Sequence, residues 1–311
     1  PAPMPPSDTP LRILVLAGGP DRERDVSLAS GQQVTDALTE AGHDVRQRDI
    51  APDDLAALDE FADWPGDVIF PALHGRWGEG GGLQSILDER GLPYVGSRAP
   101  AAALCMDKHL TKQLLARHDI PTPEHELLEP DQPPTIGPPA VLKPVDEGSS
   151  IGMAICHDAA ELEAARRELA PQYPSLMLER YVTGMEITVS VLETPGTYGP
   201  EPLPPIHVVP ATAFYDYDAK YERDDTQYHF DIDLPGLVLA EIQRLALVVC
   251  ELVEARHLAR VDFIVDERQQ PWILEINTMP GLTSHSLLPK AAAHAGLDMP
   301  AMTDRLARLA Q

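Results

Sequence analysis

The chain has 311 residues, of which 43% are hydrophobic, enough for two or three globular domains. Its net charge of −25 argues against a general nucleic-acid binder and against docking on anionic lipid. No run approaches the roughly 18 apolar residues of a membrane span, and residues 1–10 lack the features of a signal peptide, so a disordered tail is expected there. The three scattered cysteines are expected to be buried free thiols in a reducing cytosol, which predicts a cytoplasmic protein.

Strands alternate with helices in the first part of the chain. The predicted strands cover residues 12–17, 44–49 and 67–71. A helix between the first two is expected to begin near Ser27 as its N-cap and to end at Gly42. This alternation predicts an open parallel α/β sheet, although the glycines after the first strand do not form a dinucleotide fingerprint. Glu23 follows the first strand, at the sheet edge where α/β proteins bind ligands.

A glycine-rich loop, His74 to Gly82, follows the third strand. Five of its nine residues are glycine, which lets backbone approach a ligand closely. A flexible surface turn would explain the glycines equally well, but His74 and Glu79 in the same loop favour a site. Helices are predicted at 83–90 and 99–118, and on the second one Lys112 is expected to be a solvated charge.

The middle of the chain contains a second candidate ligand loop. A proline-rich loop at 121–139 precedes a strand at 140–144 that ends on Lys143. The loop VDEGSSIG follows at 145–152, and its backbone N–H groups could cradle phosphates. It is not a Walker A sequence, and an ordinary hairpin loop is the competing explanation. A return strand at 152–156 and a helix at 159–169 complete this part.

The pattern after residue 170 is again mixed. Strands are predicted at 175–182 and 186–192, and helices at 237–255, 287–296 and 300–310. The proline-rich stretch 194–210 is expected to be a loop between strands. The aromatic and charged stretch 212–230 is expected to be a long ordered loop, which is uncommon unless it is functional.

The stretch from residue 260 to 286 organises the chain. It predicts two strands, 260–265 and 272–277, that pair as a hairpin, with Arg260, Asp262, Glu275 and Asn277 on one face. The opposite face is expected to be apolar and to carry Val261, Phe263, Val265, Trp272, Leu274 and Ile276. Two carboxylates and an amide oxygen suit Mg²⁺ that bridges phosphates. A solvated outer face would explain any one of these residues alone, but not all four followed by the loop TMPGLTS.

Seven motifs together resemble the ATP-grasp superfamily, and within it the D-alanine:D-alanine ligase family. They are GG…ERDVSL (18–28), ALHGRWGEGG (72–81), CMDK (105–108), KPVDEGSSIG (143–152), FYDYDAKY (214–221), RVD (260–262) and EINTMPGLTSHS (275–286). Their order over residues 12–310 makes the resemblance specific, since no single motif would be.

The resemblance implies an α/β (α+β) ATP-grasp fold of three domains. These are an N-terminal open parallel α/β domain that binds substrate (1–97), a central domain that carries the lid (98–183), and a C-terminal domain with the Mg²⁺ site (184–311), the last two clamping ATP between antiparallel sheets. The implied reaction converts D-alanine and ATP into a D-alanyl phosphate. A second D-alanine then attacks this intermediate, and the D-alanyl-D-alanine formed serves peptidoglycan synthesis. A homodimer is also implied.

The resemblance also implies roles for single residues. Two Mg²⁺ ions, with Mn²⁺ as an alternative, would be held by Asp262, Glu275 and Asn277. ATP would be bound by Lys108, Lys143, Ser149, Ser150, Glu179, Arg180, Tyr181, Val182, Glu186 and Lys220. The amino-acid substrates would be bound by Glu23, His74, Lys220, Ser286 and Leu287. Catalysis would depend on Glu23, Ser149, Tyr221, Arg260 and Gly281.

Two other functions stay open at this point. One is an ATP-grasp ligase that joins a carboxylate to a different amine, against which Glu23 and His74 argue. The other is a nucleotide-binding regulator without catalysis on the same fold. Retention of the four polar hairpin residues argues against the second alternative; these are Arg260, Asp262, Glu275 and Asn277.

Overall fold

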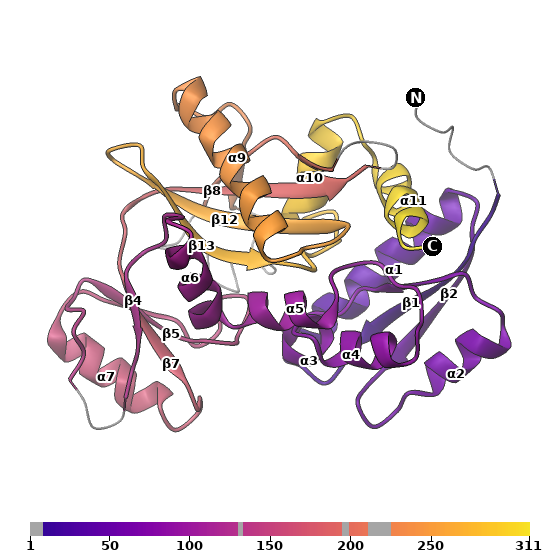
Figure 1. Ribbon diagram of the computed structural model, residues 1–311, viewed down its shortest axis with the longest axis horizontal. Coiled ribbons are helices and arrows are strands. Elements are labelled where there is room, and N and C mark those ends of the chain that lie inside the picture. The colour runs from indigo at the N-terminus through magenta and orange to yellow at the C-terminus, as the bar shows by residue number, and fades with distance from the viewer. Residues whose placement is uncertain (1–8, 130–132, 195–198, 211–224) are drawn as a thin grey trace.

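The computed structural model describes residues 9–129, 133–194, 199–210 and 225–311. Three sheets follow one another along the chain, as Figure 1 shows: the N-terminal sheet lies at lower right, the middle sheet at lower left and the C-terminal sheet above both. The domain boundaries expected at 97/98 and 183/184 fall between the sheets, and they stay a prediction. Within the described ranges, no helix has the length and apolar character needed to cross a bilayer.

The N-terminal sheet is parallel, as predicted. Its order is β2-β1-β3, with strands β1 (Arg12–Gly18), β2 (Asp44–Ile50) and β3 (Val68–Pro71). The helices of this part are α1 (Arg24–Glu40), α2 (Ala56–Asp63), α3 (Gly75–Glu79) and α4 (Gly82–Glu89). The short helix α3 lies within the expected glycine-rich loop. The carboxyl ends of β1 and β3 therefore lead directly into Glu23 and His74.

The prediction that Ser27 caps α1 is wrong. The helix begins at Arg24, and Ser27 lies buried inside its first turns. Its hydroxyl accepts a hydrogen bond from Gly18 N at 2.9 Å and donates one to Ala72 O at 2.7 Å. The side chain therefore satisfies backbone groups at the ends of two strands instead of those of its own helix.

The single helix expected at 99–118 is two helices. They are α5 (Ala99–Met106) and α6 (Lys108–Arg117). Asp107 between them has extended backbone geometry, and its carboxylate accepts a hydrogen bond from Leu110 N at 2.9 Å. A helix N-cap needs this arrangement, so Asp107 ends one helix and begins the next.

The middle sheet is antiparallel, with the order β4-β7-β5-β6. Its elements are β4 (His125–Leu127), β5 (Ala140–Pro144), β6 (Ala154–Cys156), α7 (Ala159–Leu169) and β7 (Leu176–Arg180). Strand β4 lies within the expected proline-rich loop, so that expectation is wrong there. The prolines flank this edge strand instead of interrupting it, and edges tolerate proline. Residues 130–132 of the same stretch lie outside the described residues.

The C-terminal sheet has the path β11-β10-β8-β12-β13, with β9 paired to β8. Its strands are β8 (Gly184–Glu193), β9 (Pro200–Pro202), β10 (Ile206–Val209), β11 (Gln227–His229), β12 (Leu258–Asp266) and β13 (Pro271–Asn277). The helices are α9 (Gly236–Leu252), which lies across this sheet in Figure 1, α10 (Leu287–His294) and α11 (Met299–Leu309). The stretches 194–210 and 212–230 therefore contain three strands where loops were expected. Residues 195–198 and 211–224 lie outside the described residues.

The hairpin of β12 and β13 pairs as predicted on its polar face. Arg260 lies opposite Asn277, and Asp262 lies opposite Glu275. Its apolar face differs, because the register shifts after Asp262 and inserts an extra residue into β13. The residues Ile273 and Ile276 are buried in the core, whereas Trp272 and Leu274 are only half-buried. The assignment of Trp272 and Leu274 to the core face is therefore wrong, since a β-bulge changes which side chains share a face.

Candidate active site between the three sheets

Two cavities meet at the polar face of the hairpin. The larger cavity lies between the middle and C-terminal sheets, and the smaller cavity lies between the hairpin and the loops after β1 and β3. Residues that line both cavities are Lys108, Arg260, Glu275 and Leu287. A group bound at the inner end of the larger cavity would therefore reach a molecule bound in the smaller one.

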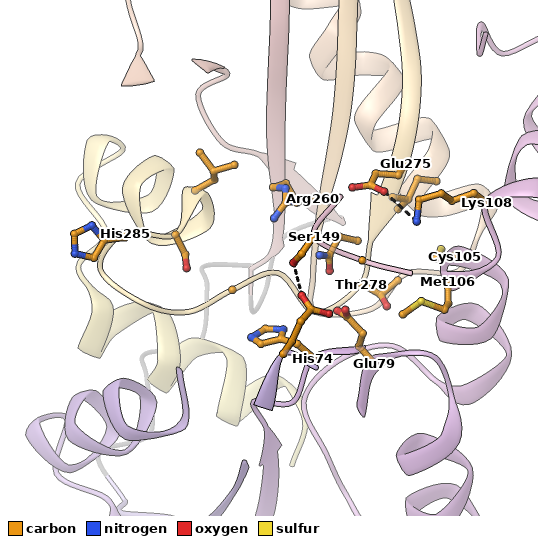
Figure 2. Close-up of a pocket in the computed structure, with 17 residues that line it drawn as sticks. His74, Glu79, Cys105, Met106, Lys108, Ser149, Arg260, Glu275, Thr278 and His285 are labelled. Atoms are coloured by element: carbon orange, nitrogen blue, oxygen red, sulfur yellow. Dashed lines mark hydrogen bonds and ion pairs between the residues drawn. The ribbon is translucent and has the colours of Figure 1, made fainter. Parts of the chain in front are cut away.

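Charged side chains on the hairpin are held by direct contacts. Arg260 donates two hydrogen bonds to Asp262, with Nε–Oδ1 2.9 Å and Nη2–Oδ2 2.8 Å. Thr188, one strand away, donates to Asp262 Oδ1 at 2.6 Å. Lys108 Nζ lies 3.3 Å from Glu275 Oε2, a contact drawn in Figure 2. Arg260 and Lys108 therefore place positive charge next to the carboxylates of Asp262 and Glu275. A metal ion bound there would also be attracted by these two carboxylates.

The oxygen donors fit Mg²⁺. Asp262 and Glu275 are direct neighbours across the two strands, and Asn277 follows on the same face of β13. The Asn277 side-chain oxygen accepts a hydrogen bond from Met279 N at 2.9 Å, which fixes its orientation. In the described part of the chain, no group of three or more His, Cys, Asp or Glu side chains is arranged to hold a metal ion by itself. An ion here would therefore be held by two carboxylates, the amide oxygen and phosphate oxygens.

The larger cavity has apolar walls and a charged inner end. Its walls include Val141 and Ile155 of the middle sheet, and Ile264 and Leu274 of the hairpin. A slot between two sheets with a few polar groups at its edge suits a planar ring. The predicted ATP-binding residues that line it are Lys108, Lys143, Ser150, Glu179, Arg180, Tyr181, Val182 and Glu186.

Lys112 contradicts its prediction as a solvated charge. Its side chain is fully buried, and its ammonium lies 2.5 Å from Glu179 Oε2. Glu179 Oε1 accepts a hydrogen bond from Lys143 at 2.9 Å. Burial raises the pKa of Glu179, but the attraction of both lysines outweighs it, so the pKa lies below its usual value. The carboxylate is therefore ionised between two cations.

The smaller cavity gathers titratable groups from the N-terminal part. Ser149 donates a short hydrogen bond to Glu23, and Figure 2 shows His74 and Glu79 beside this pair. Burial lowers the pKa of His74, although the nearby negative charge of Glu23 opposes this, so the imidazole is neutral at pH 7. Burial and the charge of Glu23 raise the pKa of Glu79 well above its usual value. Because His74 is neutral and the pKa of Glu79 is raised, Glu23 is the carboxylate of this cavity that suits a substrate ammonium.

The far side of the smaller cavity is formed by the loop before α10. Ser286 is the N-cap residue of α10, and its hydroxyl accepts a hydrogen bond from Thr283 N at 3.1 Å. A Cβ at Gly281 would lie 2.7 Å from Ser286 Oγ, which explains the glycine there. The N-terminus of α10 attracts negative charge, so this side suits a substrate carboxylate.

The structure brings the predicted site residues together around these two cavities. All of those that it describes line the larger cavity, the smaller cavity or both. Lys220 and Tyr221 lie outside the described residues. The roles assigned to single residues stay predictions.

Several residues at the site were not predicted. Thr188 holds Asp262, and Cys105 and Met106 line the smaller cavity. The signal for Thr188 was present, because Thr188 alternates along β8 with Glu186 and Ser190. That alternation places the three on one face of the strand. The contribution of Cys105 and Met106 depends on the end of α5, which the sequence pattern placed inside a longer helix.

The class of this protein is defined by two antiparallel sheets that enclose a cavity. One carries a lysine and a Gly/Ser loop, and the other carries an acidic hairpin with an arginine. This is the ATP-grasp arrangement of ATP-dependent ligases. The family model described as "D-ala D-ala ligase C-terminus" matches residues 113–308. The chain belongs to the D-alanine–D-alanine ligase family.

Individual relatives agree with this assignment. The chain is 43% identical to a D-alanine–D-alanine ligase of Chromohalobacter salexigens over 95% of this chain and 93% of the relative. It is 40% identical to that of Moorella thermoacetica over 96% of this chain and 99% of the relative. A crystal structure of the Bacillus anthracis ligase matches with a TM-score of 0.82 at 31% identity, covering 96% of this chain and 97% of that one. The Bacillus anthracis ligase complexed with ATP matches with a TM-score of 0.80 at 28% identity, covering the same shares.

Proposed function

We propose that the protein joins two D-alanine molecules into D-alanyl-D-alanine, with ATP consumed and ADP and phosphate released. The observation that carries this proposal is the meeting of the two cavities at Lys108, Arg260 and Glu275. A nucleotide in the larger cavity would direct its terminal phosphate there, and an amino-acid carboxylate in the smaller cavity would face it. The product would serve peptidoglycan precursor synthesis in the cytoplasm.

The residues around the larger cavity would bind and orient the nucleotide. The segment Glu179 to Val182 would contact the adenine and Glu186 the ribose, while Lys108 and Lys143 would bind phosphate oxygens. Asp262, Glu275 and Asn277 would hold Mg²⁺, which would neutralise negative charge on the phosphates. Mn²⁺ is the alternative ion.

The first chemical step would form the acyl phosphate. A carboxylate oxygen of the first D-alanine attacks the γ-phosphorus, and the bond from that phosphorus to the β,γ-bridging oxygen breaks, which releases ADP. Glu23 would hold the ammonium of this D-alanine, and the neutral His74 would lie beside it. Arg260 would stabilise the negative charge on the phosphoryl group in transit.

The second step would form the peptide bond. The amine of the second D-alanine attacks the acyl carbon, and the carbon–oxygen bond to phosphate breaks once the amine has lost its proton. Arg260 and the backbone N–H of Gly281 would stabilise the oxyanion of the tetrahedral intermediate. Ser286 and Leu287, at the N-terminus of α10, would bind the carboxylate of this second substrate.

Phosphate release tests the proposed function. The purified protein with ATP and Mg²⁺ is expected to release phosphate with D-alanine and not with L-alanine, and the dipeptide is expected to appear in equal amount. Turnover with another amino acid but not with D-alanine would assign a different ligase. Nucleotide binding without phosphate release under any substrate would favour a regulator. We also propose that the protein is a homodimer. Light scattering during size-exclusion chromatography measures its mass in solution and tests this.

A further inference from the structure

Lys112 is a buried cation behind the wall of the larger cavity. It lies in the middle of α6, and none of its surface is exposed. Its ammonium lies 2.6 Å from Thr122 Oγ1, 3.3 Å from Ile273 O and 2.5 Å from Glu179 Oε2. Two of the three N–H donors of the ammonium are donated to Thr122 and Ile273, and its charge is paired with the carboxylate of Glu179. Lys112 is thereby fixed in place and cannot itself reach a ligand.

Glu179 connects this buried lysine to the cavity. Only 2% of Glu179 is exposed, yet it lines the larger cavity together with Lys143. One carboxylate oxygen faces Lys112, and the other accepts the hydrogen bond from Lys143. The three residues therefore form a row in which only the front cation, Lys143, faces the cavity.

We propose that Lys112 is a positioning residue for nucleotide binding, which keeps Glu179 charge-balanced when Lys143 turns its ammonium towards a nucleotide phosphate. The identity of the ligand rests on the proposed function above. Lys112 itself touches neither nucleotide nor amino acid.

The reason is the cost of an unpaired buried charge. If Lys143 were the sole partner of Glu179, a phosphate that attracts Lys143 would leave a carboxylate alone in a buried position, and that is strongly unfavourable. With Lys112 behind it, Glu179 retains a cation at 2.5 Å throughout. Lys143 can then exchange between carboxylate and phosphate at little cost, while Glu179 keeps its place beside the adenine slot.

The charged groups around Lys112 define a pH dependence. They are Glu179 on β7, Lys143 on β5, Glu275 on β13 and His125 on β4. Burial lowers the pKa of Lys112 and the repulsion from Lys143 acts in the same direction, so the pKa is about 8 despite the attraction of Glu179. When Lys143 moves towards phosphate, that repulsion weakens, so the nucleotide complex holds the Lys112 proton more tightly than the free protein. Nucleotide affinity is therefore expected to fall as the pH rises through 8.

The test measures ADP binding in the presence of Mg²⁺ by calorimetry, between pH 7 and 9.5. The variant Lys112→Met is expected to bind ADP at least about tenfold more weakly at pH 7, because it leaves Glu179 with Lys143 alone. It is also expected to lose the fall in affinity around pH 8. Arg256→Met is the control, since Arg256 is a half-buried cation that donates to the backbone of Tyr94 and Gly96, away from both cavities. It is expected to lower Tm without changing ADP affinity.

A milder change keeps the test decisive if Lys112→Met does not fold. Thr122→Val removes one hydrogen-bond acceptor of Lys112 and keeps the shape, so it should weaken ADP binding in the same direction by a smaller factor. In the double variant Lys112→Met with Glu179→Gln, no carboxylate is left unpaired when Lys143 turns towards phosphate, so ADP affinity should recover in part relative to Lys112→Met. ADP affinity and pH profile equal to those of the unaltered protein, in Thr122→Val or in a folded Lys112→Met, would overturn the proposal. Because ADP binding needs no turnover, this result is separate from the D-alanine assay.

Discussion

Ser149 donates a hydrogen bond to Glu23, which lies 126 positions earlier in the chain. The contact joins the loop after β5 to the loop after β1, so it connects the middle and N-terminal sheets across the smaller cavity. Arg76 and Asp146 form an ion pair at 3.1 Å beside it. The Gly/Ser loop is therefore held over the smaller cavity by side chains from the N-terminal part, which couples this loop to the residue expected to bind the first substrate.

Removing the Ser149 hydroxyl should weaken this coupling. Ser149→Ala removes a hydrogen bond to a charged group, worth about 1.5–3 kcal/mol, so kcat/KM for D-alanine should fall by at least about tenfold. Steady-state phosphate release measures it. Ser85→Ala is the control, because Ser85 is exposed and donates to Gly81 O, at the N-cap of its own helix. Equal kinetics in the two variants would contradict the role of the contact.

The hairpin carboxylates should determine the dependence on Mg²⁺. Asp262→Asn removes one negative charge from the proposed ion site, so phosphate release at a fixed low Mg²⁺ concentration should fall by about a hundredfold or more. Part of the lost phosphate release should be restored at high Mg²⁺ concentration, and a Mg²⁺ titration measures this recovery. Asp266→Asn, four positions along the same strand, changes a carboxylate that accepts from Trp272 Nε1 at 3.0 Å instead. Its Mg²⁺ titration should match that of the unaltered protein.

Glu79 should make the protein less stable as the pH rises. Its pKa in the folded state is raised by burial and by the charge of Glu23, whereas in the unfolded chain it is about 4.3. The stability that the protonated form contributes is present below the unfolded value and is lost as the pH rises towards the folded pKa, by up to about 1.4 kcal/mol per pH unit. Glu79→Gln should remove this slope, so its gain in free energy of unfolding over the unaltered protein should be larger at pH 7 than at pH 5. Glu89→Gln, at an exposed position, should leave the pH dependence of stability unchanged. Urea unfolding of both variants and of the unaltered protein at pH 5 and pH 7 measures the difference.

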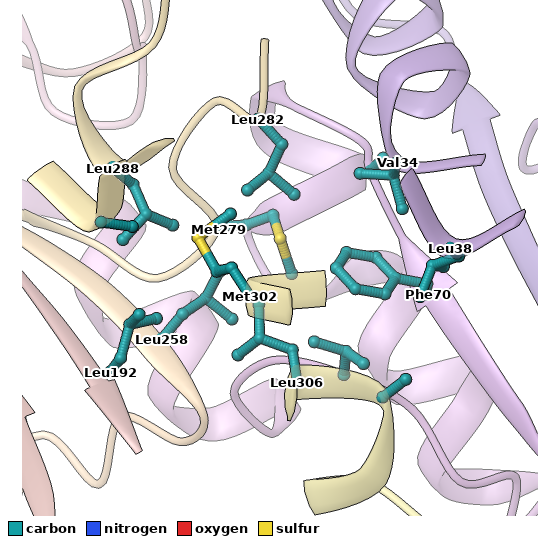
Figure 3. Packing of buried hydrophobic residues seen from close by; sticks show 14 of the residues in the cluster. Val34, Leu38, Phe70, Leu192, Leu258, Met279, Leu282, Leu288, Met302 and Leu306 are labelled. Atoms are coloured by element: carbon teal, nitrogen blue, oxygen red, sulfur yellow. The ribbon is translucent and has the colours of Figure 1, made fainter. Parts of the chain in front are cut away.

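The C-terminal helix should be needed for the stability of the N-terminal sheet. Figure 3 shows Met302 and Leu306 of α11 among Leu38 and Phe70 of the N-terminal part, in one core. Leu306 is fully buried, so Leu306→Ala should lower the free energy of unfolding by about 2–5 kcal/mol. Leu237→Ala is the control, because Leu237 is 86% exposed and its truncation should change stability by less than about 0.5 kcal/mol. Denaturant unfolding of both variants measures the difference, and equal losses would refute the packing argument.

Local sequence patterns were sufficient to predict helices and strands where buried residues recur with a regular period. The strand 140–144 and the helix 159–169 have the predicted limits, and the polar pairs of the hairpin are in the predicted register. These patterns were insufficient where a single residue interrupts the regular spacing of buried residues. Asp107 divides a helix by capping, and the extra residue in β13 changes the sides of Trp272 and Leu274. Short edge strands such as β4 were missed because their pairing partners come from distant parts of the chain.

The amino-acid sequence by itself determined the family, the parallel N-terminal sheet and which side chains are candidates for the chemistry, because motifs and residue types can be read directly from the sequence. Only the tertiary structure decided that Lys112 is buried against Glu179 and that α11 packs on the N-terminal sheet. It also decided that the two cavities meet at Arg260 and Glu275. These outcomes depend on contacts between residues far apart in the chain. The burial of a charge or a helix face depends on what packs against it, and no local period encodes that partner.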